Sequence, residues 1–172
     1  TPSGPVTEAI ASPTENRNVN GNGQLFITKN TTLNFGFNYG QNRIQNQGVT
    51  DLSLRERAFD MRIDNTNFNA STRSILSTKV IFETRLAFGH QFNSTTPKTD
   101  AVQINVLGAF NGGGSQNRNR NTRNNWAMGQ TLRWTASPKI NMVSGVDAFL
   151  NQIHGFSEAN YLGSFTFSSL DD

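Results

Sequence analysis

The sequence predicts an all-β protein, in which an antiparallel meander of about six or seven long strands forms part of a large transmembrane β-barrel. Apolar and polar residues alternate in repeated blocks, which is the period-two pattern of β-strands. The blocks run to about ten residues or more, against about five or six for an average strand. The connections between them are alternately short and long, as are the periplasmic turns and extracellular loops of outer-membrane barrels.

The composition excludes several other classes of protein. Only 34% of the residues are hydrophobic and 16% are charged, below the ~45–50% and ~25% of typical soluble domains. The chain nevertheless has 13 Phe and 2 Trp, which disordered segments seldom keep. It has no apolar run of the ~20 residues that a transmembrane helix needs. Because it has no cysteine, disulfide scaffolds and cysteine-ligated metal sites are excluded.

Residues 1–20 predict a loop or linker, since they hold three of the five prolines and no sustained apolar period. The chain begins with Thr1 and lacks a signal-peptide pattern, so we expect a processed chain or a fragment. Residues 21–172 are predicted to form the partial transmembrane β-barrel. Its first hairpin is expected over about 24–41, with a tight turn at Lys29-Asn30. The apolar face of this hairpin is formed by Leu33, Phe35, Phe37 and Tyr39.

The second hairpin is expected over about 60–92, with a short connection at Ser77-Thr78. In its second strand, apolar side chains between Val80 and Phe92 share one face, while Glu83 and Arg85 share the other. These two charged residues are candidates for a charge ladder in the lumen, although two separately solvated side chains are favoured. The first strand of this hairpin has no strongly apolar face across Arg62–Ser74, so we expect that strand to be short or partly outside the membrane.

The third hairpin is expected over about 124–152, across a connection at 136–139. Trp126 and Trp134 fall on one face of it, eight residues apart. This spacing is ~26 Å along a strand and suits the two aromatic girdles of an outer-membrane barrel. A further strand is expected to begin near Ser164, and long polar loops are expected over 41–58, 93–123 and about 154–163.

One face of these hairpins is expected to meet lipid, and the other is expected to meet water in the barrel lumen. The aromatic residues expected at the membrane interface are Tyr39, Phe92, Trp126 and Trp134. The polar residues expected in the lumen are Asn34, Asn38, Glu83, Arg85, Gln91, Arg133, Asn141, Asp147 and Asn151. A soluble antiparallel sheet with one exposed polar face is the alternative; strand length and the alternating connections favour the barrel.

Several segments resemble the barrel domain of TonB-dependent outer-membrane receptors, and within these the Oar-like group with a carboxypeptidase-regulatory-like domain. The segments are NVNGNGQLFITKNTTLNFGFNYGQN (Asn18–Asn42), Asn46-Gln47-Gly48 with LRERA (Leu54–Ala58), VLGAFNGGGSQNRNRNTRNNW (Val106–Trp126) and SEANYLGSFTFSSLDD (Ser157–Asp172). The resemblance implies a barrel of about 22 strands around a plug domain, in the outer membrane of a Gram-negative bacterium. The partners that it implies are outer-membrane lipid, the plug and remaining strands of the same protein, and an energy-coupling inner-membrane protein.

The sequence contains none of the common catalytic motifs, so neither enzymatic activity nor a cofactor is expected. His90 and His154 are the only histidines, and no metal site is expected at either. The run Gly112–Gly114 is expected to be flexible loop in preference to an anion cradle, since no helix is predicted after it.

Arg118, Arg120 and Arg123 cluster within a stretch rich in Gly and Asn. A solvated loop is the favoured reading of this cluster. Binding of lipopolysaccharide or another anionic ligand is the second, because guanidinium groups suit phosphate. Nucleic acid is not expected as a partner, because no stacking aromatic residue interleaves with the arginines before Trp126.

The leading functional hypothesis is therefore a segment of a TonB-dependent outer-membrane receptor barrel that takes up a scarce ligand. The alternative is a secreted or surface β-rich structural or adhesive protein that forms a fibre or assembly, because strands rich in Asn favour ladders between chains. A third hypothesis is a soluble polysaccharide-binding β-sandwich, in which Trp126 and Tyr161 would line a groove.

Overall fold

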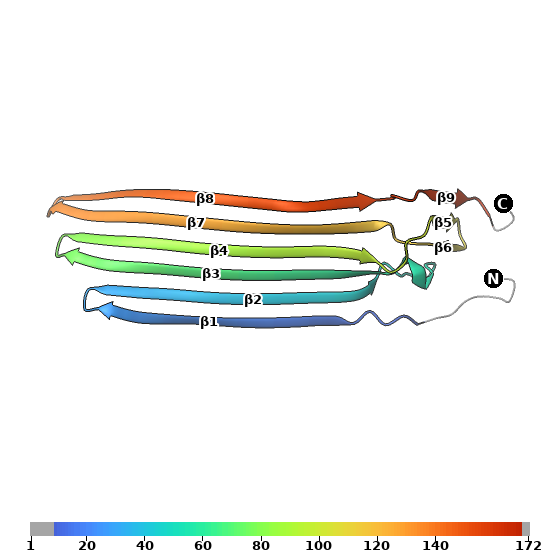
Figure 1. The fold of residues 1–172 in the computed structure, drawn as a ribbon, viewed down its shortest axis with the longest axis horizontal. Coiled ribbons are helices and arrows are strands. Elements are labelled where there is room, and N and C mark those ends of the chain that lie inside the picture. Colours follow the sequence, from blue (N-terminus) through green and yellow to red (C-terminus); the bar gives the residue numbers. More distant parts are fainter. Residues whose placement is uncertain (1–8, 170–172) are drawn as a thin grey trace.

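The computed structural model describes residues 9–169 and forms two β-sheets (Figure 1). The larger sheet has six strands in the order β1-β2-β3-β4-β7-β8, and every neighbouring pair in it is antiparallel. The predicted all-β fold and antiparallel meander are confirmed. The strands are β1 (Thr14–Thr28), β2 (Thr31–Gln47), β3 (Phe59–Ser77), β4 (Val80–Pro97), β7 (Asn117–Ser137) and β8 (Ile140–Ala159).

The three predicted hairpins exist, but their strands extend well beyond the predicted bounds. The interpretation of residues 1–20 as a linker is wrong from Thr14 onward, because Thr14–Asn20 belongs to β1 and pairs with β2; the linker predicted over residues 1–8 lies outside the described residues. The strand before Ser77-Thr78 is not short, since β3 has 19 residues. Polar residues such as Asn16 and Asn42 pair through their backbones, so these extensions have no apolar alternation that a sequence pattern could reveal.

A second, three-stranded sheet lies at the end of the molecule opposite the short turns (Figure 1). It contains β5 (Gln103–Val106), β6 (Phe110–Gly112) and β9 (Ser164–Phe167), in the order β6-β5-β9. The strand predicted near Ser164 is therefore present, but it is not a seventh strand of the meander, because it pairs in parallel with β5. Together with the short 3-10 helix η1 (Arg55–Arg57), this sheet forms what we call the crown.

The predicted long connections are thus largely structured. Gly112–Gly114 is buried, so its interpretation as flexible loop is wrong. The backbone N–H of Gly113 donates to Oε1 of Glu56, and the guanidinium of Arg57 donates to the Gly114 carbonyl. The Glu56 carboxylate therefore occupies the position of an anion beside these glycines. Among the described residues, the only buried apolar side chains are Ala58 and Val106, both near the crown.

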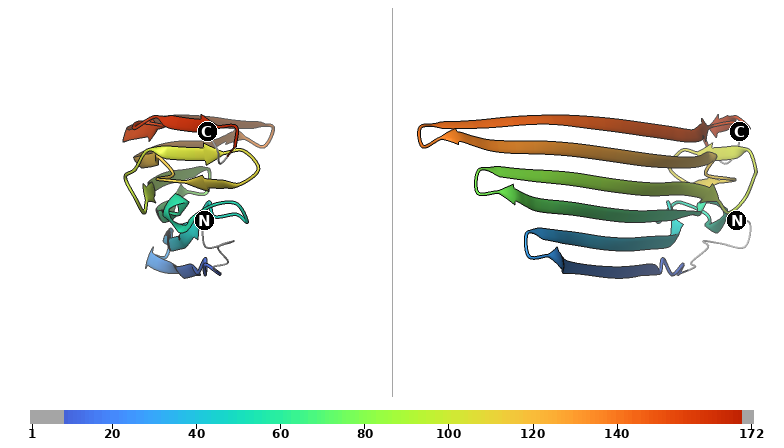
Figure 2. Two further views of the ribbon diagram at one scale, coloured as in Figure 1. Left: turned by 90° about the vertical axis from the view of Figure 1, so that its right-hand side faces the viewer. Right: turned by 60° about the vertical axis from the view of Figure 1, so that its left-hand side comes forward.

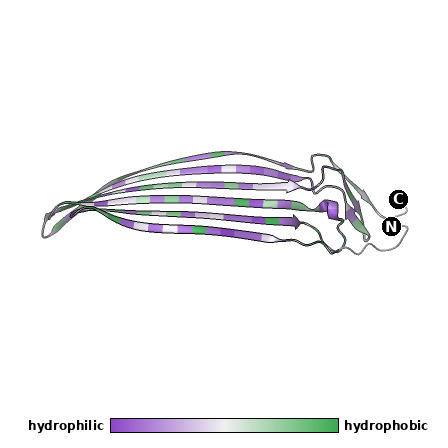
Figure 3. Ribbon diagram, turned by 60° about the horizontal axis from the view of Figure 1, so that its bottom comes forward, coloured by the Kyte–Doolittle hydropathy of each residue, from purple (hydrophilic) through white to green (hydrophobic). Residues whose placement is uncertain are grey.

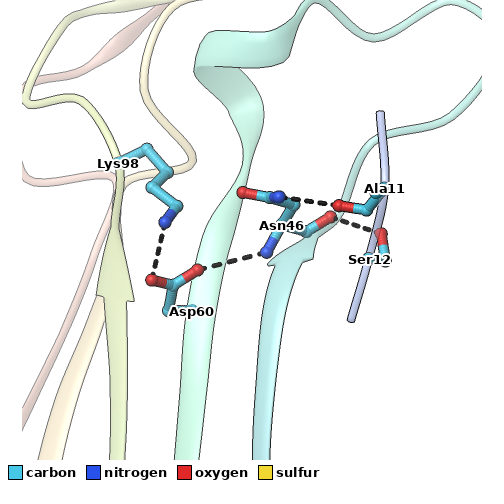
Figure 4. A network of polar contacts seen from close by, with 5 residues as sticks. All are labelled: Ala11, Ser12, Asn46, Asp60 and Lys98. Atoms are coloured by element: carbon cyan, nitrogen blue, oxygen red, sulfur yellow. Dashed lines mark hydrogen bonds and ion pairs between the residues drawn. The ribbon is translucent and has the colours of Figure 1, made fainter. Parts of the chain in front are cut away.

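A polar network joins the strand ends beneath the crown (Figure 4). Asn46, at φ 54°, donates from its backbone N–H to Asp60 and from its side-chain amide to the Ala11 carbonyl. Asp60 also accepts from Lys98 at 2.7 Å, while Ser12 donates to the Asn46 carbonyl. These contacts connect the chain just before β1 with β2, β3 and the residue after β4.

The three short turns are staggered in the plane of the sheet (Figure 2). Thr31, the first residue after one turn, pairs with Ser74, three residues before the end of β3. Val80, the first residue after the next turn, pairs with Trp134, again three residues before the end of its strand. Each hairpin therefore extends three residues, ~10 Å, beyond the turn of the preceding hairpin. The distance across the sheet from one hairpin to the next is two strand spacings, also ~10 Å. The line through the three turns thus runs at about 45° to the strands, so the strands are inclined by about 45° to the perpendicular of that line.

The larger sheet is a single layer (Figure 3). In the part of the chain from residue 9 to residue 169, no second sheet covers either of its faces, and large apolar side chains such as Phe35, Phe68 and Trp126 are exposed. The polysaccharide-binding sandwich requires a second layer over these strands, and the described residues do not form one. β1 and β8 each have one unpaired edge within the described sheet.

Candidate membrane-facing surface

The register of the strands divides the larger sheet into two chemically different faces. Directly paired residues lie on the same face of an antiparallel sheet, so side-chain positions can be followed from strand to strand. Phe37 pairs with Phe68, Phe68 with Phe88, Phe88 with Trp126, and Trp126 with Leu150. We call the side that carries this row the aromatic face.

Most apolar residues of the aromatic face lie in the half of the sheet next to the short turns, while Phe92 and Phe156 lie further from the turns on the same face. On successive strands this apolar region ends at Tyr39, Phe68, Phe88, Trp126 and Leu150. Beyond these residues the next positions on the same face are polar: Gln41, Thr66, His90, Asn124 and Gln152. We call the apolar region the apolar band. On β4 it covers nine residues from Val80 to Phe88, ~30 Å along the strand and ~21 Å at a 45° tilt.

The four predicted interface aromatics all lie on the aromatic face, at different distances from the short turns. Trp134 is four residues from Pro138 at the turn, whereas Trp126 is twelve residues from it. Tyr39 lies at the far limit of the band and Phe92 lies four residues beyond it, at nine and thirteen residues from the turns of their own hairpins. Trp126 and Trp134 are about half exposed, at 51% and 46%.

The opposite face is polar over most of its area, and we call it the asparagine face. One row of it consists of Asn20, Asn38, Asn67, Asn125 and Asn151, with Gly89 as its member on β4. All nine polar residues predicted for the lumen lie on this face. The edge strand β8 presents the most apolar side chains there, Val143, Phe149 and Ile153, all exposed. Phe26 on β1 and Ile75 on β3, near the short turns, are also exposed on this face.

Charged side chains on the asparagine face form ion pairs across the strands. The carboxylate of Glu83 lies 3.7 Å from Arg73 on β3 and 3.6 Å from Arg133 on β7. Arg85 lies 3.5 Å from Asp147 on β8 and donates to Thr131. Glu83 and Arg85 are therefore not two separately solvated side chains, since each has an ion-pair partner on a neighbouring strand. The position of this charge ladder in a lumen stays a prediction. The partners of Glu83 are on strands that are distant in sequence, so no local spacing could identify them.

The arginine cluster predicted from sequence is divided by the structure. Arg118, Arg120 and Arg123 lie in β7, not in a loop. The first two are on the aromatic face, and Arg123 is on the asparagine face, because strand residues an odd number of positions apart point to opposite faces. Arg120 is exposed and lies over the ring of Phe92, with 5.5 Å from its Cζ to the ring centroid.

Arg118 belongs to a compact polar cluster next to the crown. One of its guanidinium nitrogens donates to both carboxylate oxygens of Asp100 at 2.7 Å, and the guanidinium lies 5.0 Å from the ring of Tyr161. The Tyr161 hydroxyl donates to Asp100 at 2.5 Å. These two donors lower the pKa of Asp100, the Tyr161 hydrogen bond first, and the same hydrogen bond raises the pKa of Tyr161.

Sequence reasoning missed the partners in these clusters. Asp100 and Tyr161 are 61 positions apart, and neither was expected to act with Arg118. Arg62, which donates to Asp64 at 2.8 Å and lies 5.6 Å from Phe92, was also missed. The period-two pattern signals which face these residues occupy, but only the pairing of the strands brings them together.

No group of three or more metal-ligating His, Cys, Asp or Glu side chains is found within the described residues. Across residues 9–169, no helix has the length and apolar character needed to cross a membrane. Comparison of the chain with models of known protein families, with curated proteins and with solved structures finds no match.

Proposed function

We propose that this chain is a segment of a TonB-dependent outer-membrane receptor, in which the six-stranded sheet forms part of the barrel wall. The single observation that carries the proposal is the pairing of an uncovered apolar band with a polar opposite face in one layer of long strands. Lipid would cover the rings on the aromatic face, including Phe88 and Trp126. The asparagine face would line the lumen, where water or a plug satisfies its polar groups.

Two features of the geometry support this assignment. The ~45° tilt obtained from the stagger of the turns is close to the ~35–45° of strands in outer-membrane barrels. The apolar band on β4, ~21 Å along the membrane normal at that tilt, is comparable to the ~25 Å band of such barrels. In this assignment the short turns face the periplasm and the crown faces outward.

The unpaired edges of β1 and β8 would then pair with further strands of the same barrel. The chemistry of uptake would be non-enzymatic: the wall encloses a ligand path, and energy reaches the plug from an inner-membrane partner. This part of the proposal rests on the resemblance of the sequence to such receptors.

The test compares two neighbouring positions on one strand in the full-length protein that carries this chain. Leu86 lies on the aromatic face and Ala87 on the asparagine face. The chain has no cysteine, so Leu86→Cys and Ala87→Cys each introduce one thiol for a spin label. In lipid vesicles, the label at 86 is expected to be relaxed by oxygen and shielded from a water-soluble nickel complex, with the reverse at 87. Equal access of the nickel complex to both labels would contradict the proposal.

A second candidate is the secreted or surface assembly, which the two long open edges favour. In that case β1 of one copy would pair with β8 of the next, and the row of asparagines would continue between chains. Association that grows with protein concentration in detergent-free buffer, with cross-links between cysteines introduced in β1 and β8 of different copies, would support this candidate. The same cross-links would be absent from a monomeric barrel.

A further inference from the structure

Three arginines form a row on the aromatic face, beyond the apolar band. Arg43 on β2 pairs with Arg62 on β3, Arg62 pairs with Ser94 on β4, and Ser94 pairs with Arg120 on β7. Each lies four to six residues past the last apolar residue of the band on its own strand. We call Arg43, Arg62 and Arg120 the arginine row.

The row carries more positive charge than its neighbours balance. Asp64 is the carboxylate next to it, and Arg62 is paired with Asp64 at 2.6 Å. On β1, Glu15 is opposite Arg43 but is already paired with Arg17. Two further carboxylates on this face lie close to the row: Asp60 on β3, which is paired with Lys98, and Glu158 on β8, which is opposite Arg118. No ion pair joins Arg43 or Arg120 to any of these carboxylates among the described residues.

Two of the guanidinium groups in the row have unused capacity for hydrogen bonding. Nε of Arg43 has no hydrogen-bond partner, but it is buried, so a lipid phosphate would meet the terminal nitrogens of this guanidinium. Arg120 is exposed, and its guanidinium lies over the ring of Phe92. A guanidinium offers five N–H donors in a planar fork that fits two oxygens of a phosphate.

Phe92 draws two of these groups toward the apolar band. The Cζ atoms of Arg62 and Arg120 lie 5.6 Å and 5.5 Å from the centroid of its ring, within the range of a cation–π interaction. Phe92 is half-buried and precedes Ser94 by two positions on the band side. Since the arginine stems are long and apolar, they can lie along the face while the charged ends stay at the level where lipid headgroups begin.

We propose that the arginine row binds the phosphate groups of lipids in the leaflet on the crown side of the membrane. This inference rests on the proposed function, because the acyl chains of the same lipids would cover the apolar band. A lipid is favoured over a soluble anion because the row and the band lie on one face of the same strands. Arg118 is not part of the row, since it lies two residues beyond Arg120 on β7, opposite Glu158, and is paired with Asp100. Arg123 is excluded because it is on the asparagine face.

The test uses native mass spectrometry of the full-length protein in detergent, with diphosphoryl lipid A as the probe and its dephosphorylated form for comparison. The unsubstituted protein is expected to retain the phosphorylated lipid and to retain the other form about tenfold less. Arg120→Gln is the first variant, because it leaves the Arg62–Asp64 pair intact. Its binding of the phosphorylated lipid is expected to fall about fivefold to tenfold.

Arg123→Gln is the matched control, since it removes the same charge from the same strand on the other face. It is expected to bind as the unsubstituted protein does. Equal retention of the two lipid forms, or equal losses in Arg120→Gln and Arg123→Gln, would overturn the inference. The spin labels at positions 86 and 87 show whether the proposed function fails as well. If the chain is a barrel wall but its arginine row does not bind phosphate, the label at 86 is still relaxed by oxygen and the label at 87 is still reached by the nickel complex.

Discussion

The rings of Phe88 and Trp126 lie 4.3 Å apart across β4 and β7 and are inclined by 42°. Their residues are directly opposite in the register, although β5, β6 and the rest of the crown connection separate the two strands in sequence. Aromatic pairs of this kind stabilise a sheet beyond the area that they bury. Here the pair lies at the boundary of the apolar band, where the second and third hairpins meet.

The first prediction concerns a charge placed within the apolar band. Met128 lies on the aromatic face, two residues inside Trp126, and Ala127 points the other way. In lipid vesicles, Met128→Arg is expected to lower the free energy of unfolding by about 1–3 kcal/mol, because arginine is costly on a lipid-facing position. Ala127→Arg is expected to change it by less than about 1 kcal/mol, because lumen positions tolerate charge. Urea unfolding of both variants measures the difference, and equal losses would contradict the assignment of the faces.

The second prediction concerns the ion pairs of Glu83. Its two partners, Arg73 and Arg133, have side chains that are 59% and 54% exposed. Glu83→Gln is therefore expected to cost less than about 1 kcal/mol in urea unfolding, since water and salt screen exposed pairs. The loss should shrink further in concentrated salt. A loss several times larger, unchanged by salt, would mean that the pairs are shielded from water in the assembled protein.

Much of the larger sheet could be predicted from the sequence, because its central segments alternate strictly. Leu33, Phe35 and Phe37 define a face without any knowledge of their partners, and Lys29-Asn30 is the turn that was expected. The same pattern gave no signal for β7 before Asn124, where Arg, Asn and Thr occupy both faces. The strand continues there because backbone groups pair whatever the side chains are.

The candidate site could be predicted less well, because its contacts join distant segments. β5 and β9 pair although about sixty residues of chain separate them, and no periodicity in the sequence predicts such a parallel contact. Arg118 and Arg120 appeared as a local cluster, but their actual partners are Asp100 and Phe92. The spacing of the arginines shows which face each one occupies only if they are known to lie in a strand, and the sequence predicted a loop there.

The third prediction concerns the pH dependence of the Asp100 cluster. The pKa of Asp100 is lowered by donors that favour its ionised form, so its stabilising effect is full above the ordinary aspartate pKa of about 3.9 and is lost as the pH falls through the lowered value. The pKa of Tyr161 is raised, so its stabilising effect is full below about pH 10 and is lost as the pH rises through the raised value.

Tyr161→Phe tests this pH dependence directly. The variant removes the hydroxyl that donates to Asp100 and keeps the ring beneath Arg118. The pKa of Asp100 is expected to move up toward its ordinary value, as measured by the carboxyl carbon chemical shift in an NMR titration. An unchanged titration midpoint would mean that the hydroxyl does not hold the carboxylate in solution.

The fourth prediction separates two glycines that have similar backbones and different surroundings. Gly108 and Gly113 have φ values of 71° and 74°, a region that other L residues enter at a cost. A Cβ at Gly108 would meet nothing within 4 Å, whereas a Cβ at Gly113 would collide with the Val102 carbonyl oxygen. Gly108→Ala should therefore cost only the backbone strain, about 1 kcal/mol. Gly113→Ala should cost more, because the backbone on one side of the contact must move.

The larger effect of Gly113→Ala should be local to the crown. Moving Gly113 disturbs its N–H donation to Glu56 and the neighbouring bond from Arg57 to Gly114. Amide hydrogen exchange is thus expected to accelerate in β5, β6 and η1 of that variant, while the strands that carry the apolar band keep their protection, because their ladders do not depend on the crown. If exchange instead accelerates equally in the crown and in β4 and β7, the crown and the long sheet unfold as one cooperative unit.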